Sequence, residues 1–308
     1  MNVMMGKATT LKESISITIV IFMGLMSGCP SPDTHAILEN QIWIHGSQDC
    51  STNRDSLIQI VQYNENTWIL RQNKCIHYEA PFMYLLIGQE KALLVDTGAT
   101  GEESSFPLYR MVRTILSDWE EAHKVKLSLI VTHTHGHRDH IAGDEQFVGK
   151  PDTKLVAAQV DDIKKFFGIQ HWPIDHGSVD LGKRVVTIIP IPGHEKASIA
   201  FYDQASRLLL TGDTFYPGRL YVEDWGAFKQ SIATLLEFSE HHPPMFILGN
   251  HIEMSTTPGI DYPTGSTYQP EEHQLPLTIV ELKELHLSLI RIDVPVREVH
   301  DNFIISPK

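Results

Sequence analysis

Residues 127–140 read LSLIVTHTHGHRDH, an apolar run that leads directly into four histidines and an aspartate. The run at residues 127–131 has the length and composition of a buried β-strand. Imidazole and carboxylate groups are good ligands for zinc and similar divalent ions. So many of them at the end of one strand predict a metal centre, because a solvated polar loop has little use for them.

The spacing within this stretch leaves the choice of ligands open. Alternate side chains of an extended segment point to the same side, so His133, His135, His137 and Asp139 share a face. His140 follows immediately and adds a fourth imidazole. Spacing alone therefore does not decide which of these histidines bind a metal ion.

Four further polar motifs come directly after expected strands. They are Asp96-Thr97-Gly98, Pro192-Gly193-His194, Thr211-Gly212-Asp213 and Gly249-Asn250-His251. Together with the His-x-His-x-Asp-His pattern of residues 135–140, they resemble the ordered motifs of the metallo-β-lactamase superfamily. The resemblance covers roughly residues 66–252, and five motifs in the family's order are far more specific than any one of them.

This resemblance implies an α/β fold, a four-layer αββα sandwich, with two divalent metal ions at one edge. Zinc is the expected metal. By the same resemblance, the first ion is held by His135, His137 and His194, the second by Asp139, His140 and His251, and Asp213 bridges the two. Asp96 is expected to orient the ligand loop, and His133 falls outside the motif as a supporting or structural residue.

The family likeness also implies a hydrolase, in which a hydroxide held between the ions attacks a carbonyl carbon. True β-lactamases usually lack one of the residues that match His140 and Asp213, whereas glyoxalase II-type thioesterases and lactonases resemble this chain in having both. We therefore expect an ester, thioester or lactone substrate, with Asp139 as a catalytic proton carrier. Tyr216, three residues after Asp213, is interpreted either as a catalytic donor to the substrate carbonyl or as a packed aromatic residue.

Because the fold does not determine the substrate, other functions stay open. They are β-lactamase activity, an iron-dependent oxidoreductase similar to the persulfide dioxygenases, and a non-catalytic metal-binding lipoprotein. The formal net charge of −13 disfavours a nucleic-acid partner, so a small-molecule substrate is expected. The acidic pair Glu271-Glu272 in the tail argues against the basic glutathione-binding region of glyoxalase II enzymes.

The first 29 residues are typical of an exported bacterial lipoprotein. Lys7 and Lys12 precede an apolar run at residues 15–26, which is too short to span a bilayer but suits a secretory signal. The sequence Ser27-Gly28-Cys29 resembles a lipobox, although Met26 stands where leucine is usual. We expect a periplasmic or cell-surface protein that is anchored to the membrane by lipid at Cys29; the alternative is a disordered start on a cytosolic protein.

The predicted organisation is a signal peptide (1–28), a linker (29–55), a catalytic domain (56–260) and a C-terminal extension packed on the same domain (261–308). Strands are expected at residues 68–70, 82–87, 92–95, 127–131, 155–158, 185–191, 198–202, 208–210 and 245–248, and helices at residues 108–119, 228–238 and 277–290. In an exported protein, Cys50 and Cys75 either pair or remain two buried thiols.

Overall fold

The computed structural model describes residues 34–308, which belong to one compact unit. The signal peptide and the lipid-attachment site at Cys29, both expected from the sequence, lie outside the described residues. Within residues 34–308, no helix combines the length and the apolar character needed to cross a bilayer.

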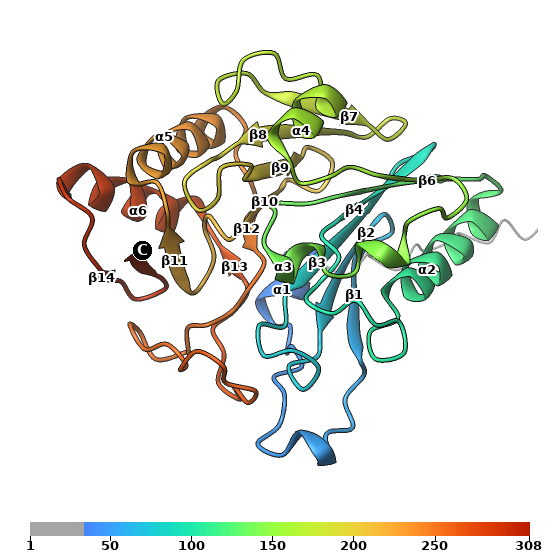
Figure 1. Cartoon of the computed structure of the whole chain (residues 1–308), viewed down its shortest axis with the longest axis horizontal. Coiled ribbons are helices and arrows are strands. Elements are labelled where there is room, and N and C mark those ends of the chain that lie inside the picture. The colour runs from blue at the N-terminus through green and yellow to red at the C-terminus, as the bar shows by residue number, and fades with distance from the viewer. Residues whose placement is uncertain (1–33) are drawn as a thin grey trace, which may run out of the picture. The chain divides into compact units, whose positions relative to one another are not determined.

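Two six-stranded sheets form the centre of the unit formed by residues 34–308 (Figure 1). The first sheet contains, in spatial order, β1 Ile58–Asn64, β2 Thr67–Gln72, β3 Phe82–Ile87, β4 Lys91–Val95, β5 Ser128–Thr132 and β6 Thr153–Leu155. The second sheet contains β13 Pro276–Leu277, β12 Phe246–Gly249, β10 Leu208–Gly212, β9 Ile199–Asp203, β8 Val185–Pro190 and β7 Gly177–Asp180. A smaller sheet is formed by β11 Arg219–Val222, β15 Ile304–Pro307 and β14 Glu298–Val299.

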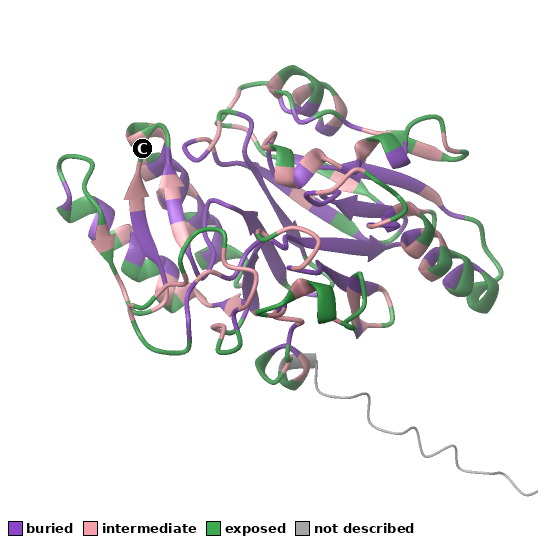
Figure 2. Cartoon of the chain, turned by 60° about the horizontal axis from the view of Figure 1, so that its bottom comes forward, coloured by how far each residue is buried: buried purple, intermediate pink, exposed green. Residues whose placement is uncertain are grey.

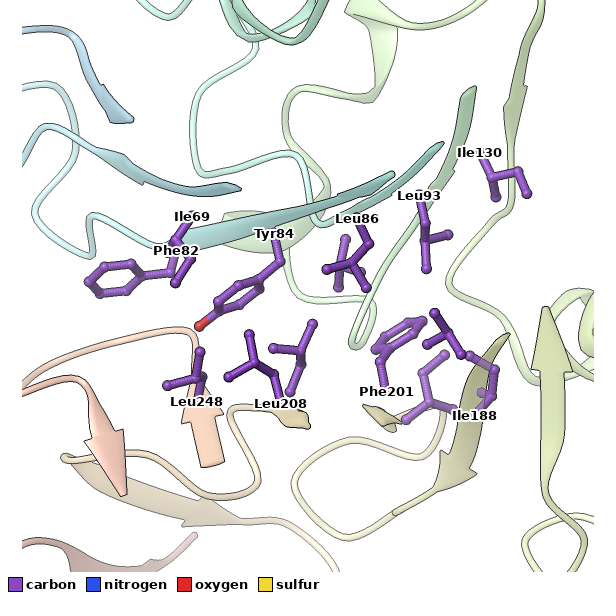
Figure 3. Close-up of a cluster of buried hydrophobic side chains, with 14 of the residues drawn as sticks. Ile69, Phe82, Tyr84, Leu86, Leu93, Ile130, Ile188, Phe201, Leu208 and Leu248 are labelled. Atoms are coloured by element: carbon purple, nitrogen blue, oxygen red, sulfur yellow. The ribbon is translucent and has the colours of Figure 1, made fainter. Parts of the chain in front are cut away.

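Apolar side chains fill the space between the two large sheets (Figure 3). Tyr84 and Leu86 of β3 and Leu93 of β4 lie opposite Phe201 of β9 and Leu208 of β10. Every residue of β3 is buried, which explains why that strand reads as a continuous apolar run rather than an alternating one. The sheets therefore share one core, and their strand ends are held in a constant relative position.

Helices cover the outer faces of both sheets. Helix α2 Leu108–His123 packs on the first sheet through Leu108, Val112, Leu116 and Trp119, which recur at helical spacing. Helices α5 Trp225–His241 and α6 Ile279–Arg291 cover the second sheet and contact each other. Their outward faces are exposed in Figure 2. The order helix, sheet, sheet, helix confirms the predicted αββα sandwich.

The remaining helical segments are short. They are α1 Thr34–Glu39, the 3-10 turn η1 Cys50–Thr52, α3 Arg138–Ile141, the 3-10 turn η2 Asp144–Gln146 and α4 Val160–Phe167. Of these, α3 follows β5 and contains two of the predicted metal ligands. Helix α4 buries Ile163 and Phe167 in the core between the sheets.

The segment predicted to be a linker differs from that prediction within its described part. Leu38 of α1 is fully buried, and the Trp43 ring meets Phe82 edge-on with centroids 4.8 Å apart. Isolated apolar residues in a polar stretch gave too weak a periodic signal to indicate this packing. Cys50 and Cys75 are joined by a disulfide, which ties the same segment to the loop between β2 and β3.

Several short or irregular strands are missed or misplaced by the sequence-based prediction. Strand β6 lies at Thr153–Leu155, slightly before its predicted position, and β1, β7, β11 and β15 were not expected at all. Their residues are partly exposed, so they lack the apolar runs of the central strands. The C-terminal residues 261–308 add β13 to the second sheet, α6 to its outer face, and β15 beside β11.

Candidate metal centre

The residues predicted to bind metal all follow strands that end at one edge of the sandwich. His135 and His137 come after β5, and His194 comes after β8. Asp213 and His251 follow β10 and β12, which run parallel to each other. Strand β9 is antiparallel to both β8 and β10, so β8 points the same way as β10. This topology brings side chains from distant parts of the chain into two groups.

The first group contains His135, His137 and His194. The Nε2 atom of His135 lies 3.0 Å from His137 Nδ1 and 3.2 Å from His194 Nε2, and the third side of this triangle is 3.1 Å. Ligand nitrogens of a tetrahedral zinc site with bonds of about 2.0–2.1 Å are separated by about 3.3 Å. The triangle therefore fits a divalent ion such as zinc.

The second group contains Asp139, His140, Asp213 and His251. Their ligand atoms converge: Asp139 Oδ2 lies 3.2 Å from the Nε2 atoms of both His140 and His251. Asp213 Oδ1 lies 3.4 Å from His140 Nε2 and 3.3 Å from His251 Nε2. Two imidazoles and two carboxylates suit zinc and similar divalent ions.

Asp213 connects the two groups. While its Oδ1 atom faces the second group, its Oδ2 atom lies 3.8 Å from His194 Nε2 of the first. The Oδ1 atom is buried and forms no hydrogen bond with any residue of the described chain. A buried carboxylate oxygen without a partner is costly, and a cation between the groups would satisfy it.

Most of the histidines use their second ring nitrogen to contact a supporting group. In the second group, His140 Nδ1 lies 2.9 Å from Asp96 Oδ2, and His251 Nδ1 lies 3.1 Å from the Glu79 carbonyl oxygen. Both contacts turn Nε2 toward the centre of the group. Such partners fix the tautomer and the ring orientation of a metal-binding histidine.

The first group is supported in the same way. His194 Nδ1 lies 2.8 Å from the carbonyl oxygen of Tyr221 in β11. His135 Nδ1 lies 3.1 Å from the Thr134 hydroxyl. His137 is reversed, with Nδ1 facing the group and Nε2 lying 3.9 Å from a Glu223 carboxylate oxygen. The ring orientations therefore match a pre-organised metal centre.

Asp96 is the main anchor beneath the ligands. Its carboxylate accepts hydrogen bonds from the Thr134 backbone N–H (2.7 Å), the Thr134 hydroxyl (2.8 Å) and Asn250 Nδ2 (2.5 Å), in addition to its contact with His140. The residue is fully buried and has φ 68°, a backbone conformation that non-glycine residues seldom adopt. These bonds hold the end of β4 to the ligand loop and to the residue before His251.

In the second group, the carboxylates and the imidazoles shift each other's pKa values in opposite directions. Burial would raise the pKa of Asp213 and of Asp139, but the neighbouring imidazoles of His140 and His251 hold both values below the usual range. Burial would lower the pKa of His140 and of His251, but these carboxylates raise both values well above the usual range. The two carboxylates therefore stay ionised and favour positive charge among them.

In the first group, by contrast, the pKa values of two histidines are lowered. Burial lowers the pKa of His135 well below its usual value, and the neighbouring His140 and His194 add to this effect. Burial also lowers the pKa of His194. A neutral imidazole is the form that binds metal, so these rings need not lose a proton first.

His133 lies outside both groups. Its Nδ1 atom is 3.2 Å from the His140 carbonyl oxygen, and its Nε2 atom is 3.3 Å from Asp144 Oδ1. The ring is buried beneath the ligand loop. Its position is that of a structural residue that supports the backbone of His140.

Tyr216 does not have the geometry of a substrate donor. Its side chain is buried, and its hydroxyl donates to the carbonyl oxygen of Arg219 at 2.5 Å and lies 3.1 Å from Glu253 Oε2. The ring packs against His251 with centroids 5.7 Å apart. Because the hydroxyl is already engaged, the predicted catalytic role is corrected in favour of the alternative, a packed aromatic residue beside the centre.

Several supporting residues were missed by the sequence-based prediction. Thr134 and Asn250 lie inside the quoted motifs, next to His135 and His251, so their position was a usable signal. Glu79 and Tyr221 contribute backbone carbonyl groups, which leave no trace in residue type.

Comparisons with known proteins agree with this geometry. The family model described as the metallo-beta-lactamase superfamily matches residues 79–251. A hydroxyacylglutathione hydrolase of Bdellovibrio bacteriovorus is 28% identical over 165 residues, 53% of this chain and 59% of that protein. An acyl-coenzyme A thioesterase of Homo sapiens is 26% identical over 176 residues, 46% of this chain and 60% of that protein. The match thus spans less than two thirds of either relative.

Among solved structures, a metallo-beta-lactamase from Erythrobacter litoralis has a TM-score of 0.51 and 13% sequence identity. The alignment covers 78% of this chain and 99% of that one. At this identity the similarity shows the shared fold.

Proposed function

This chain belongs to the metallo-beta-lactamase superfamily and is a hydrolase, and we propose that it cleaves ester, thioester or lactone carbonyls. The proposed reaction centre holds two divalent ions, with zinc as the expected metal. The observation that carries this proposal is the position of Asp213. One of its carboxylate oxygens faces each ligand group, and His140 completes the second group. The chain therefore has the residues for two adjacent ions.

When bound, two such ions would make water a strong nucleophile at neutral pH and polarise the carbonyl oxygen of a substrate. The protein's own contribution is to hold four of the seven ligands, all histidines, in place through Asp96, Thr134 and the carbonyl groups of Glu79 and Tyr221. In the reaction, hydroxyl adds to the carbonyl carbon and the carbon–sulfur or carbon–oxygen bond breaks. The remaining proton passes to the leaving thiolate or alkoxide, and we propose Asp139, a carboxylate of the second ligand group, as its carrier.

The ease with which the leaving group departs favours hydrolysis of thioesters and esters over hydrolysis of β-lactams. A thiolate departs with little help, whereas an amide nitrogen needs a proton as it leaves and therefore a placed acid. Tyr216, the side chain that could have supplied a hydroxyl, is turned away toward Arg219 and Glu253. The names of the two relatives above, a hydroxyacylglutathione hydrolase and an acyl-coenzyme A thioesterase, support thioesters as the first substrates to test.

A hydrolysis screen tests the proposal. Zinc-loaded protein is offered a thioester, a γ-lactone, an aryl ester and a penicillin, and the metal content of the same preparation is measured. We expect about two ions per chain and kcat/KM for the thioester or the lactone well above that for the penicillin. Efficient penicillin turnover with negligible ester cleavage would overturn the proposal, as would oxygen uptake by an iron-loaded form that hydrolyses nothing.

We also propose that the protein is exported and anchored to the membrane by lipid at Cys29. The Cys50–Cys75 disulfide supports export, because disulfides persist in oxidising compartments and are rare in the bacterial cytosol. Mass spectrometry of the mature N-terminus after expression in a bacterial host tests this proposal. The expected product starts at an acylated Cys29, and a soluble product that starts at Met1 would refute it.

A further inference from the structure

A pocket lies between three segments of the chain, one of which is α3, the helix that also carries the ligands Asp139 and His140. Ile76 comes from the loop after β2, Thr100 and Ser105 come from the loop after β4, and Arg138 and Ala142 come from α3 and its C-terminal end. Arg138 directly precedes the ligand Asp139. The pocket, with a volume of about 620 Å³, therefore shares α3 with the second ligand group.

Hydrogen bonds within the protein fix the walls of this pocket. The side chain of buried Gln72 accepts from the Ala99 N–H at 2.8 Å and donates to the Thr100 hydroxyl oxygen at 2.7 Å. Ala142 N donates to the Gly98 carbonyl oxygen at 3.1 Å. Gly101 packs so closely on this turn that a Cβ atom would lie 2.9 Å from the Ala142 carbonyl oxygen. The shape of the pocket is therefore fixed by hydrogen bonds and packing within the fold.

The charges of the pocket favour a single carboxylate. Arg138 is exposed, and no residue of the described chain forms a hydrogen bond or an ion pair with its guanidinium group. Guanidinium binds carboxylate through paired hydrogen bonds, and Thr100, whose oxygen already accepts from Gln72, has its hydroxyl hydrogen free to donate. Glu102 lines the same pocket and would repel a multiply charged phosphate more than a single carboxylate.

We propose that this pocket binds a carboxylate on the leaving thiol or alcohol of the substrate, and that Arg138 is a specificity-determining residue. The inference rests on the proposed function, which it narrows to substrates with an acidic leaving group. Because Arg138 directly precedes Asp139 in α3, we expect the carboxylate on the part of the leaving group that extends from the centre toward this helix.

Matched thioesters test the preference. The zinc-loaded protein is given S-acetyl-3-mercaptopropionate and its neutral amide, S-acetyl-3-mercaptopropanamide. We expect the ratio of kcat/KM, carboxylate over amide, to fall roughly tenfold in Arg138→Gln, as for the loss of a charge-assisted pair. Glu102→Gln should raise the same ratio several-fold. Arg110→Gln, at an exposed position of α2 outside the pocket, is the matched control and should leave the ratio unchanged.

A second measurement does not depend on turnover. Phenylglyoxal modifies exposed arginines, and peptide mass spectrometry gives the separate rates at Arg138 and Arg110. Butyrate, but not butyramide, should slow modification of Arg138 at least threefold and leave Arg110 unaffected. Equal ratios in all variants, together with no protection by butyrate, would overturn the inference. If the wild type cleaves neither thioester, the proposed function fails instead, and the protection experiment alone decides whether the pocket binds a carboxylate.

Discussion

His140 Nδ1 lies 2.9 Å from Asp96 Oδ2, so Nε2 of His140 faces Asp139, Asp213 and His251. Asp96 follows a strand of the first sheet, and its partner Asn250 follows a strand of the second. One buried carboxylate therefore joins the two halves of the sandwich at the point where their ligands meet. The geometry of the second ligand group depends on this residue.

Asp96→Asn should weaken metal binding without removing a ligand. An amide that presents its NH₂ to His140 can no longer accept the Nδ1 proton, so the ring loses its fixed tautomer. Changes at such supporting residues typically cost about 10–100-fold in metal affinity. Competition with a chromophoric chelator measures the zinc affinity, and circular dichroism shows whether the variant is folded. Asp161→Asn, on the exposed side of α4, is the control. A folded Asp96→Asn protein with wild-type zinc affinity would contradict the assignment.

Asp213→Ala should bind less than two ions per chain and lose most of the hydrolytic activity. Its two oxygens face the two groups, so alanine removes a contact from each of them. His133→Ala, which alters a buried imidazole of the same loop outside both groups, serves as the comparison and should retain the metal. Elemental analysis after dialysis gives the stoichiometry. Loss of metal in His133→Ala but not in His137→Ala would show that the ligand register is wrong.

The ligand positions could be predicted because they are side chains in short motifs placed directly after apolar strands. His135, Asp213 and His251 converge since β5, β10 and β12 end at the same edge of the sandwich. The strands themselves were visible for the same reason, as continuous apolar runs such as residues 82–87.

Features that depend on backbone atoms or on isolated contacts could not be predicted. The carbonyl groups of Glu79 and Tyr221 support two histidines, yet any residue type would provide them. The burial of Trp43 depends on packing against residues far along the chain, such as Phe82. Tyr216 has the expected spacing from Asp213, but the direction of its hydroxyl is set by Arg219, a partner that spacing does not reveal.

Tyr216→Phe should cost stability rather than activity. The substitution removes a buried hydroxyl that donates to the Arg219 carbonyl oxygen, and we expect a loss of about 0.5–1.5 kcal/mol in the free energy of unfolding. Because this hydroxyl does not face the ligand groups, kcat/KM should stay within about threefold of the wild-type value. Urea unfolding and steady-state kinetics on one thioester measure both quantities. A large fall in kcat at unchanged stability would restore the catalytic role predicted from the sequence.

A buried charge cluster lies under the loop between β2 and β3. Arg71 pairs with Glu272 through two contacts of 2.5 and 2.7 Å. Lys74 Nζ lies 3.6 Å from the same carboxylate and donates to the Tyr78 carbonyl oxygen at 3.2 Å. Glu272 belongs to the C-terminal residues, so the cluster attaches them to the loop that carries Glu79 and supports His251.

The stability of the folded protein should rise with pH because of Lys74. Burial lowers the pKa of its ammonium group from 10.5 to about 8, and Glu272 offsets only part of this effect. Between these two values the unfolded chain holds a proton that the folded chain has released, so the free energy of unfolding increases as pH rises through this window. At about 1.4 kcal/mol per pKa unit, the gain is at most about 3.5 kcal/mol.

Urea unfolding at pH 7.5 and 9.5 measures this gain as a difference between wild type and Lys74→Met, since the difference cancels the titration of other groups. Lys154→Met, at an exposed position of β6, is the matched control and should show no pH-dependent difference from the wild type. We expect the free energy of unfolding of Lys74→Met, relative to that of the wild type, to fall as the pH rises, because the wild type no longer buries an ammonium charge. A difference between the two proteins that stays constant between the two pH values would show that the pKa of Lys74 is not lowered, and that the buried ammonium is fully compensated by Glu272.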